Sequence, residues 1–272
     1  MSSSSEQSSV YDWDQVRQKM TQSVTLIMGG AQGTGKLAAQ QLLELGCPVV
    51  IADLNAKRLA ATAKEFASYG DDKLFTMPAD ATNPREVQAL IAAIIAKFGK
   101  LNNVVYCAGA VRAQRPSLEV DGDEWDLIVN SNLKGAFLTE KAAIPEMIRA
   151  GGGSIVNMSS RAGRLSSLFL GIHYTVSKTG ILGLTRHIAT EFGSQGIRAN
   201  SICPGGIIGE RMTYLMSQLN REGDLEKLAK QSPLGRNVFE KDVVGAILFL
   251  LSDLSSFITG AIIDVNGGTL TV

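Results

Sequence analysis

Tyr174 and Lys178 stand four residues apart in the run YTVSKTGILGLTRHIATEFG. On an α-helix this spacing places both side chains on one face, one turn apart. A Lys ammonium roughly 4–6 Å from a phenol favours the phenolate and lowers the phenol pKa from about 10, so Tyr174 becomes a usable acid/base. Tyr69 and Lys73 have the same spacing, but the Gly-Asp-Asp sequence between them predicts a turn that aligns no side chains. We therefore expect Tyr174 and Lys178 to exchange a proton with a hydroxyl or carbonyl oxygen.

Two further polar residues complete the candidate catalytic set. Ser160 ends the run SIVNMSS, fourteen residues before Tyr174, where its hydroxyl can donate a hydrogen bond to a substrate oxygen that gains negative charge. Asn132 lies in the segment IVNSNLKGAFLTEK, and we expect it to hold a water that links Lys178 to solvent. Both have structural alternatives, because Ser160 can cap a turn or helix and Asn132 can be a core amide with its hydrogen bonds satisfied.

A glycine-rich turn, Gly29 to Gly35, joins the apolar run VTLIM to the helical segment GKLAAQQLLELG. Glycines at such a turn let backbone amides approach a pyrophosphate, whose charge is favoured by the amino end of the helix. The Gly-x-x-x-Gly-x-Gly spacing departs from the general dinucleotide fingerprint, and a tight turn alone is the alternative explanation. The turn predicts a phosphate cradle for a dinucleotide, with hydride transfer at its nicotinamide end.

Asp53 ends the run PVVIAD, eighteen residues after Gly35. A carboxylate there accepts hydrogen bonds from the adenosine ribose hydroxyls and repels a 2′-phosphate, so we expect NAD to be preferred over NADP. The neutral Gln32, and the lack of Arg or Lys after Asp53 until Lys57, favour the same choice. Capping of the next helix is the alternative role of Asp53, and also of Asp80, which we expect near the adenine edge.

From residue 23 onward, short apolar runs alternate with amphipathic helical segments. This pattern is typical of buried parallel strands and their crossover helices. We expect an α/β fold in which residues 23–272 form a single-domain, Rossmann-like, doubly wound parallel sheet. Residues 1–22 are Ser-rich at their start and are expected to form a tail that is disordered or packed as a short helix on the domain edge. The looser segment near 205–235 is expected to be a substrate flap.

Composition excludes several classes of protein. The formal net charge is zero, so no basic field attracts nucleic acid or an anionic membrane. Three cysteines and two histidines, with no acidic cluster at ligand spacing, argue against a metal site and for a reducing compartment. We find no apolar run long enough to span a membrane and no signal peptide pattern. We expect a cytoplasmic protein that acts on a small molecule.

Taken together, the motifs from about Val24 to Gly268 resemble the classical short-chain dehydrogenase/reductase family. They include the glycine turn, Ala108-Gly109, the run IVNMSSRAG, the Tyr174 and Lys178 pair, the segment Asn200 to Gly205, and the terminal VNGG. The resemblance implies a sheet of about seven strands, a catalytic tetrad of Asn132, Ser160, Tyr174 and Lys178, and a homotetramer or homodimer. It implies that the cofactor contacts are Gly29, Gln32, Gly33, Thr34, Gly35, Asp53, Leu54, Asp80, Ala81, Ala108, Gly109, Tyr174, Lys178, Pro204, Gly205 and Ile207.

Three positions depart from the family pattern. Met28 stands where a Thr usually precedes the glycine turn, Tyr106-Cys107 replaces the usual Asn-Asn before Ala-Gly, and Gly209 replaces a Thr near the nicotinamide carboxamide. We expect these changes to affect cofactor geometry and affinity more than reaction type.

The sequence therefore predicts an NAD-dependent oxidoreductase that interconverts a secondary alcohol and its ketone. The alternative is a catalytically silent protein that keeps the fold and binds the nucleotide.

The flap residues Arg211 to Met216 suggest an apolar or mixed substrate. Arg161, Arg164 and Arg211 suit a substrate anion, although surface arginines are more often simply solvated. Long helices near 123–150 and 174–194 carry apolar residues beyond one stripe, such as Ile181, Leu182, Leu184 and Ile188, and predict packing between copies.

Overall fold

The computed structural model describes residues 12–114, 116–167, 169–221 and 223–271. Seven strands form one parallel sheet in the order β3-β2-β1-β4-β5-β6-β7, which confirms the predicted doubly wound architecture. The strands are β1 (Thr25–Met28), β2 (Val49–Asp53), β3 (Leu74–Pro78), β4 (Asn103–Tyr106), β5 (Gly153–Met158), β6 (Ile197–Pro204) and β7 (Ile262–Val265).

Ten α-helices accompany the sheet within the described ranges. They are α1 (Trp13–Gln22), α2 (Gly33–Glu44), α3 (Ala56–Glu65), α4 (Pro84–Phe98), α5 (Gly122–Val129), α6 (Gly135–Arg149), α7 (Ile172–Phe192), α8 (Glu210–Gln218), α9 (Asp224–Gln231) and α10 (Glu240–Leu251). Short 3₁₀ turns lie at Ala67–Tyr69, Ser117–Glu119, Arg161–Gly163, Gly193–Gln195 and Asp253–Ser255. A π-helical turn, Asn130–Lys134, joins α5 to α6.

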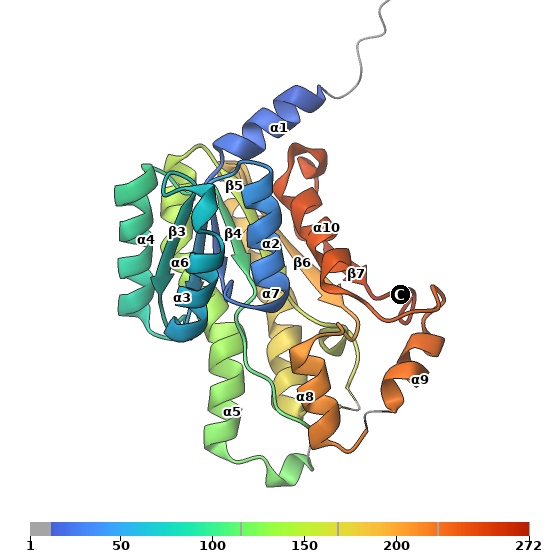
Figure 1. Ribbon diagram of the computed structural model, residues 1–272. Coiled ribbons are helices and arrows are strands. Elements are labelled where there is room, and N and C mark those ends of the chain that lie inside the picture. The colour runs from blue at the N-terminus through green and yellow to red at the C-terminus, as the bar shows by residue number, and fades with distance from the viewer. Residues whose placement is uncertain (1–11, 115, 168, 222, 272) are drawn as a thin grey trace, which may run out of the picture.

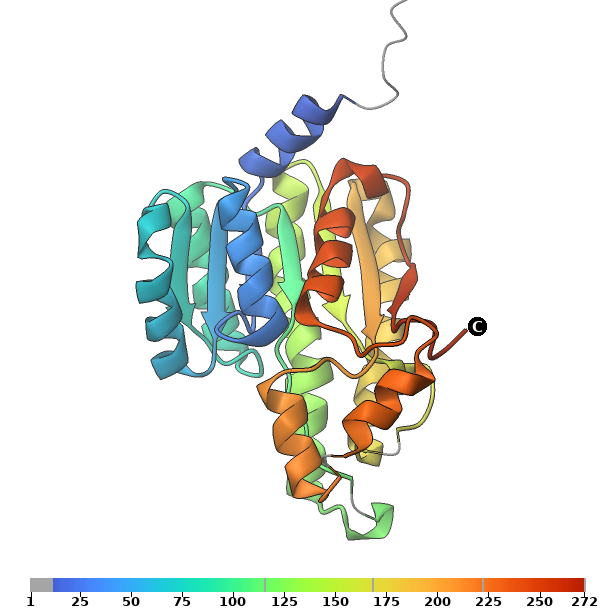
Figure 2. The same ribbon diagram turned by 45° about the vertical axis from the view of Figure 1, so that its right-hand side comes forward.

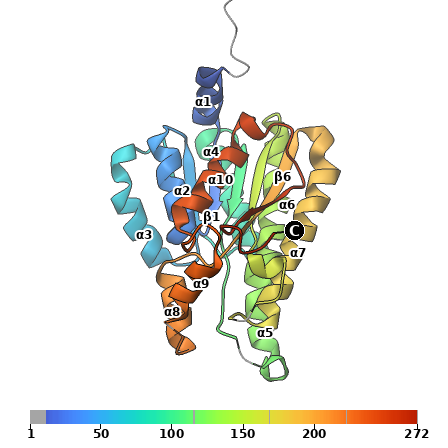
Figure 3. The ribbon, with the colours of Figure 1, turned by 90° about the vertical axis from the view of Figure 1, so that its right-hand side faces the viewer.

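The sheet is buried because helices cover both of its faces. Side chains of α4, α6 and α7 pack with one face, and those of α2, α3 and α10 pack with the other, as Figure 3 shows for most of these helices. The strands β1 and β4 are buried along their whole length, which explains their continuous apolar runs. The strand order reverses between β1 and β4, so a crevice for a ligand is expected at their carboxyl ends.

Helices outside the two layers lie at both ends of the strands. Helix α1 lies beyond the amino-terminal edge of the sheet, where Lys19 pairs with Asp253 at 2.9 Å (Figure 1). Residues 1–11 of the predicted tail lie outside the described residues. Helices α8 and α9 lie at the carboxyl ends of the strands, on the same side as α5 (Figure 2). None of the helices in the described ranges is long and apolar enough to cross a membrane.

The apolar surplus predicted on α7 is smaller than expected. Ile181, Leu182 and Ile188 are buried inside the single chain, because the sheet and neighbouring helices cover α7 on more than one side. Only Leu184 of the four stays partly exposed, and it contributes to an apolar hollow of about 560 Å³ between α6 and α7. Most of the predicted apolar surplus of these four residues is therefore accounted for by burial within one chain.

Candidate active site

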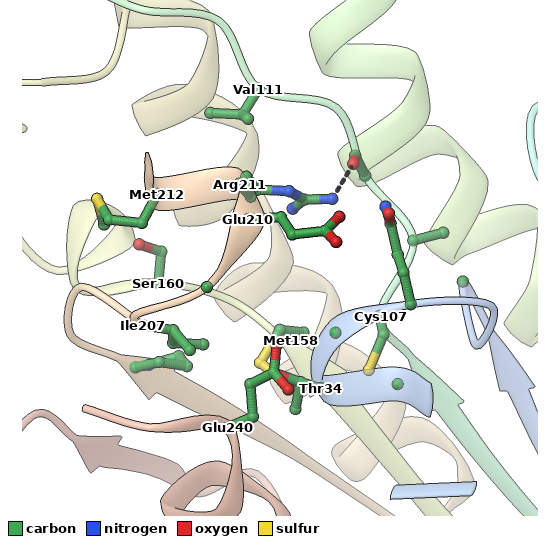
Figure 4. A pocket seen from close by; sticks show the side chains of 18 of the residues that line it. Thr34, Cys107, Val111, Met158, Ser160, Ile207, Glu210, Arg211, Met212 and Glu240 are labelled. Atoms are coloured by element: carbon green, nitrogen blue, oxygen red, sulfur yellow. Dashed lines mark hydrogen bonds between the residues drawn. The ribbon is translucent and has the colours of Figure 1, made fainter. Parts of the chain in front are cut away.

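A cavity of about 1580 Å³ runs along the carboxyl ends of the strands. It is lined by every predicted cofactor residue and by three predicted catalytic residues, Ser160, Tyr174 and Lys178. Asn132 lies directly behind the lining. Flap residues from the start of α8 and the first residue of α10 also face the cavity, as the close view in Figure 4 shows. The fold thus brings the predicted nucleotide turn and the predicted catalytic set into one space.

The glycine turn has a backbone that other residues could not adopt. Gly29 has φ +83°, and a Cβ there would lie 2.5 Å from the Ala108 backbone nitrogen. A Cβ at Gly35 would clash with the Gly29 carbonyl oxygen, so this close approach of turn and helix requires glycine. Helix α2 begins at Gly33, and no side chain caps its amino end. Open backbone N–H groups at a helix start fit a pyrophosphate, so the residues present suit a dinucleotide.

The carboxylate of Asp53 is fixed at the end of β2. Its Oδ2 accepts a hydrogen bond from the Ala31 backbone N–H at 3.1 Å, and Oδ1 accepts one from Asn55 at 2.9 Å. The side chain that caps α3 is Asn55, which accepts from the Arg58 N–H at 3.0 Å. The helix-cap alternative for Asp53 is therefore wrong. Its carboxylate instead ties the nucleotide turn to the second strand.

Asp80 forms a local turn at the end of β3. Its Oδ1 accepts hydrogen bonds from the backbone N–H and the hydroxyl of Thr82, both at 2.8 Å. Asn83 caps α4, so the cap alternative for Asp80 is also wrong. Asp80 and Ala81 both line the cavity.

Tyr174 and Lys178 lie one turn apart at the start of α7, as their spacing predicts. The Lys178 Nζ lies 5.7 Å from the centroid of the Tyr174 ring and donates a hydrogen bond to the Met158 carbonyl at 2.7 Å. Ser160 follows β5, and its Oγ accepts a hydrogen bond from the Ala162 N–H at 3.1 Å. The hydroxyl thus also starts a 3₁₀ turn, as the structural alternative for Ser160 proposes, while it remains on the cavity wall.

The pKa shifts of Tyr174 and Lys178 differ from those that the sequence predicts. Burial raises the pKa of the Tyr174 phenol, while the charge of Arg211 and a hydrogen bond with Ser160 oppose this rise. Burial, followed by the charge of Arg211, lowers the pKa of Lys178 to about 7. The pKa of Tyr174 is therefore raised, not lowered as its spacing from Lys178 predicts, and the charge of Arg211 opposes the rise. Spacing alone could not predict this, because the burial of both groups decides their charge.

Asn132 lies in the π-helical turn between α5 and α6 and is buried. Its Nδ2 donates hydrogen bonds to the carbonyls of Ala110 at 2.9 Å and Ile128 at 2.8 Å. Its Oδ1 is buried and has no hydrogen-bond partner among the described residues. A Cβ at Gly109 would clash with this oxygen, and Lys178 Nζ lies just beyond, at 3.8 Å from the same Cβ position. Asn132 therefore presents an open acceptor toward Gly109 and Lys178, and it is only partly a satisfied core amide.

Tyr106 accounts for one departure from the family pattern. Its phenol is buried at the end of β4 and donates a hydrogen bond to the Ser131 carbonyl at 2.7 Å. Ser131 belongs to the same π-helical turn as Asn132. A Cβ at Gly135 would clash with the phenol oxygen, so the Tyr and the Gly fit together. The phenol supports the turn that carries Asn132.

Glu240, the first residue of α10, lies close to the glycine turn, a position that its sequence surroundings do not predict. Its Oε1 lies 3.4 Å from the position a Cβ would take at Gly33 and 3.3 Å from the one at Gly209. Burial, followed by the charge of Glu210, raises the pKa of Glu240. No local signal in the sequence places this carboxylate near the glycine turn, about two hundred positions earlier, because only the folding of α10 against α2 brings it there.

Comparisons with known proteins agree with this architecture. A family model described as Enoyl-(Acyl carrier protein) reductase matches residues 29–270. The 3-oxoacyl-(acyl-carrier-protein) reductase FabG of Staphylococcus aureus is 34% identical over 251 residues, which are 92% of this chain and 98% of that protein. The 3beta-hydroxysteroid dehydrogenase 2 of Eggerthella lenta is 34% identical over 244 residues, 89% of this chain and 93% of the relative.

Solved structures show the same similarity. A short-chain type dehydrogenase/reductase from Mycobacterium ulcerans superposes with a TM-score of 0.84 at 34% sequence identity. The match covers 91% of this chain and 89% of that structure. The similarity thus extends over the whole sheet and both helical layers rather than over the nucleotide turn alone.

Proposed function

The chain belongs to the short-chain dehydrogenase/reductase family, and on this premise we propose that it is an NAD(H)-dependent oxidoreductase that interconverts a secondary alcohol and its ketone. One observation carries the proposal: Tyr174, Lys178 and Ser160 line the same cavity as the glycine turn and Asp53. When bound, the nicotinamide ring supplies or accepts the hydride. The residues of the chain must then supply the proton and stabilise the substrate oxygen.

Each catalytic side chain has a distinct task in this proposal. Tyr174 donates its phenolic proton to the carbonyl oxygen during reduction and accepts the proton during oxidation. Ser160 donates a hydrogen bond to the same oxygen as its negative charge grows. Lys178, with a pKa of about 7, carries a proton toward the phenol and holds the ribose hydroxyls. The open Oδ1 of Asn132 accepts a hydrogen bond from a water molecule, and this water returns protons to Lys178.

The cofactor preference rests on Asp53. Its carboxylate is held by two backbone N–H groups at the end of β2, where ribose hydroxyls can donate to it and a 2′-phosphate would be repelled. Arg58 also lines the cavity and could favour a phosphate. We expect NADH to bind about 10-fold or more tighter than NADPH, and Asp53→Ser to narrow this ratio. Equal dissociation constants for both dinucleotides, measured by fluorescence, would refute the preference.

The central experiment replaces Tyr174 by Phe. We expect NADH formation from a panel of secondary alcohols to fall by about 10³-fold or more, while the dissociation constant of NADH changes by less than about 3-fold. Tyr69→Phe is the matched control, because Tyr69 belongs to the other Tyr-x-x-x-Lys sequence and lies in a 3₁₀ turn after α3. Retained turnover in Tyr174→Phe would contradict the acid/base role. Tight NADH binding by the wild type without turnover of any alcohol or ketone would favour the catalytically silent alternative.

The proposal extends to the surroundings of the site. We infer that the segment 205–235, with α8 and α9, closes over the substrate, since residues from its first turn already line the cavity.

A cytoplasmic location is supported by the free thiols of Cys47, Cys107 and Cys203. The apolar hollow between α6 and α7 supports a homodimer or homotetramer. The named activities of the relatives differ, from an acyl-carrier-protein substrate to a steroid, so the substrate class depends on side chains of this chain.

A further inference from the structure

Arg211 reaches from the flap to the catalytic end of the cavity. It is the second residue of α8, and its Nη2 donates a hydrogen bond to the Gly109 carbonyl at 3.1 Å, the dashed line in Figure 4. Gly109 is the residue whose α-carbon faces Asn132 Oδ1 and Lys178 Nζ. The guanidinium of Arg211 is therefore hydrogen-bonded to the residue that lies against the side chains of Asn132 and Lys178, which the proposed function assigns to the proton relay.

The charge of Arg211 acts on the reacting groups. Burial raises the pKa of Tyr174 and of the Cys107 thiol, and the charge of Arg211 opposes both rises, together with that of Lys178 for Cys107. Burial lowers the pKa of Lys178, and the charge of Arg211 lowers it further. Three titratable groups, one from the loop after β4 and two from α7, thus share one cation as their neighbour. A solvated arginine that pointed away from the cavity would not have this common effect.

No carboxylate among the described residues forms an ion pair with Arg211. The adjacent Glu210 lies beside it in Figure 4, but the two side chains form no ion pair, and the charge of Glu210 acts on Glu240. The bond to Gly109 uses one of five guanidinium N–H donors. Arg211 lines the cavity on an exposed position, so its remaining donors are open to a ligand there, and Val111 and Glu210 lie near it on the same wall (Figure 4).

A cation of this kind selects the charge of a ligand. The planar guanidinium forms two parallel hydrogen bonds with a carboxylate, a geometry that an uncharged ester cannot match. Because Arg211 is anchored beside the catalytic groups, the carboxylate must lie only a few bonds from the carbon that exchanges hydride. Apolar neighbours then accommodate the rest of the molecule.

We propose that Arg211 binds a substrate carboxylate, so that the protein acts on hydroxy acids and the corresponding oxo acids. The inference rests on the proposed oxidoreductase function and adds the substrate class to it. Binding of the substrate carboxylate to Arg211 would also stabilise the closed flap, because it links the start of α8 to the catalytic end of the cavity.

The test compares each acid with its uncharged methyl ester. 3-Hydroxybutyrate and 3-hydroxyhexanoate are assayed with NAD beside their methyl esters, and the readout is the ratio of kcat/KM for acid to that for ester. Using the ratio cancels any effect that Arg211 has on the Tyr174 pKa. We expect the wild type to favour the acid by about 10-fold or more. Arg211→Met should reduce the ratio to about 1 or below, and Arg211→Lys should fall between the two.

Arg17→Met is the charge-matched control. Arg17 is exposed on α1, at the other end of the sheet, so its loss removes the same charge without touching the cavity. We expect this variant to keep the wild-type ratio. An equal rate for acid and ester in the wild type, or an acid preference that survives in Arg211→Met, would overturn the inference and leave the proposed function intact.

A binding measurement separates the two proposals. Thermal shifts of the NADH-saturated protein are recorded with benzoate and with methyl benzoate. We expect benzoate to stabilise the wild type and not Arg211→Met. Benzoate stabilisation that depends on Arg211, without turnover of any alcohol, would support the carboxylate site while refuting the oxidoreductase function. Turnover of alcohols without any stabilisation by benzoate would support the oxidoreductase function and refute the carboxylate site.

Discussion

The phenol oxygen of Tyr106 donates a 2.7 Å hydrogen bond to the backbone carbonyl of Ser131. Ser131 precedes Asn132 in the π-helical turn, so the end of β4 directly supports the segment that carries the proposed proton relay. Turns of this type open backbone carbonyls that an α-helix would use internally. Tyr106 is thus a positioning residue that acts through Asn132.

Replacing Tyr106 by Phe should therefore change catalysis as well as stability. The carbonyl of the half-buried Ser131 loses its donor, which costs about 1 kcal/mol in the free energy of unfolding. We expect kcat to fall several-fold while the KM for NADH stays within about 2-fold, because Asn132 moves but the glycine turn does not. Urea unfolding and steady-state kinetics measure the two effects. A loss of stability with unchanged kcat would assign Tyr106 a structural role only.

Glu240 places a carboxylate at the proposed phosphate cradle. Its Oε1 lies 3.4 Å from the position of a Cβ at Gly33, so a pyrophosphate bound at this turn would be repelled by the ionised carboxylate. Glu240→Gln should tighten the dissociation constant of NADH by about 5–10-fold at pH 8. Since burial raises the pKa of Glu240, the wild-type affinity should rise as the pH falls through that pKa and approach the affinity of the variant.

Fluorescence titration of NADH at several pH values measures this effect. Glu226→Gln is the control, because Glu226 is exposed on α9 and does not line the cavity. Identical pH profiles for the wild type and Glu240→Gln would show that Glu240 swings away when the dinucleotide binds.

The fold could be predicted because its determinants are local and repeated. The buried strands β1 and β2 are short apolar runs rich in β-branched residues, and helical segments with their own periodicity separate such runs along the chain. Tyr174 and Lys178 could also be paired, since one helix fixes their spacing. The glycine turn could be predicted because its backbone requires glycine at Gly29 and Gly35.

The contacts that tune the site could not be predicted in the same way. Glu240 meets Gly33, and Arg211 meets Gly109, only after distant segments have folded together. The π-helical turn at Asn132 keeps a helical sequence pattern, so periodicity does not distinguish it from an α-helix. The extra apolar residues of α7 were interpreted as an intermolecular surface, but burial of Ile181 within the chain accounts for part of that pattern.

The hollow between α6 and α7 gives a test of assembly. Leu184 and Phe137 line it together with other apolar side chains, so a second copy would bury them. We expect wild-type protein to elute as a dimer or tetramer, and Leu184→Glu to shift it to a smaller mass by light scattering. Leu118→Glu, at a fully exposed leucine outside the hollow, should leave the mass unchanged. A monomeric wild type would refute assembly through this surface.

Glu140 is a buried acid that the proposed reaction does not use. It lies on α6 within the core, and neither of its carboxyl oxygens nor the Oδ1 of Asn157 has a hydrogen-bond partner among the described residues. A protonated Glu140 can donate its O–H to Asn157, whereas a carboxylate would leave these acceptors unsatisfied. Burial raises the pKa of Glu140 from 4.5 to about 8, and the side chain of Asn157 opposes part of this rise.

This shift predicts how stability depends on pH. The folded state holds a proton that the unfolded state releases, so this contribution to stability is complete below pH 4.5 and is lost as the pH rises to about 8. Glu140→Gln keeps an amide donor for Asn157 and carries no proton to lose, so its advantage over the wild type should grow across that window to a few kcal/mol. Urea unfolding at pH 5.5 and pH 8.5 measures the difference, with Glu226→Gln as the exposed control. Parallel pH dependence in the wild type and Glu140→Gln would mean that Glu140 is ionised in the folded core, and that another cation or water satisfies it.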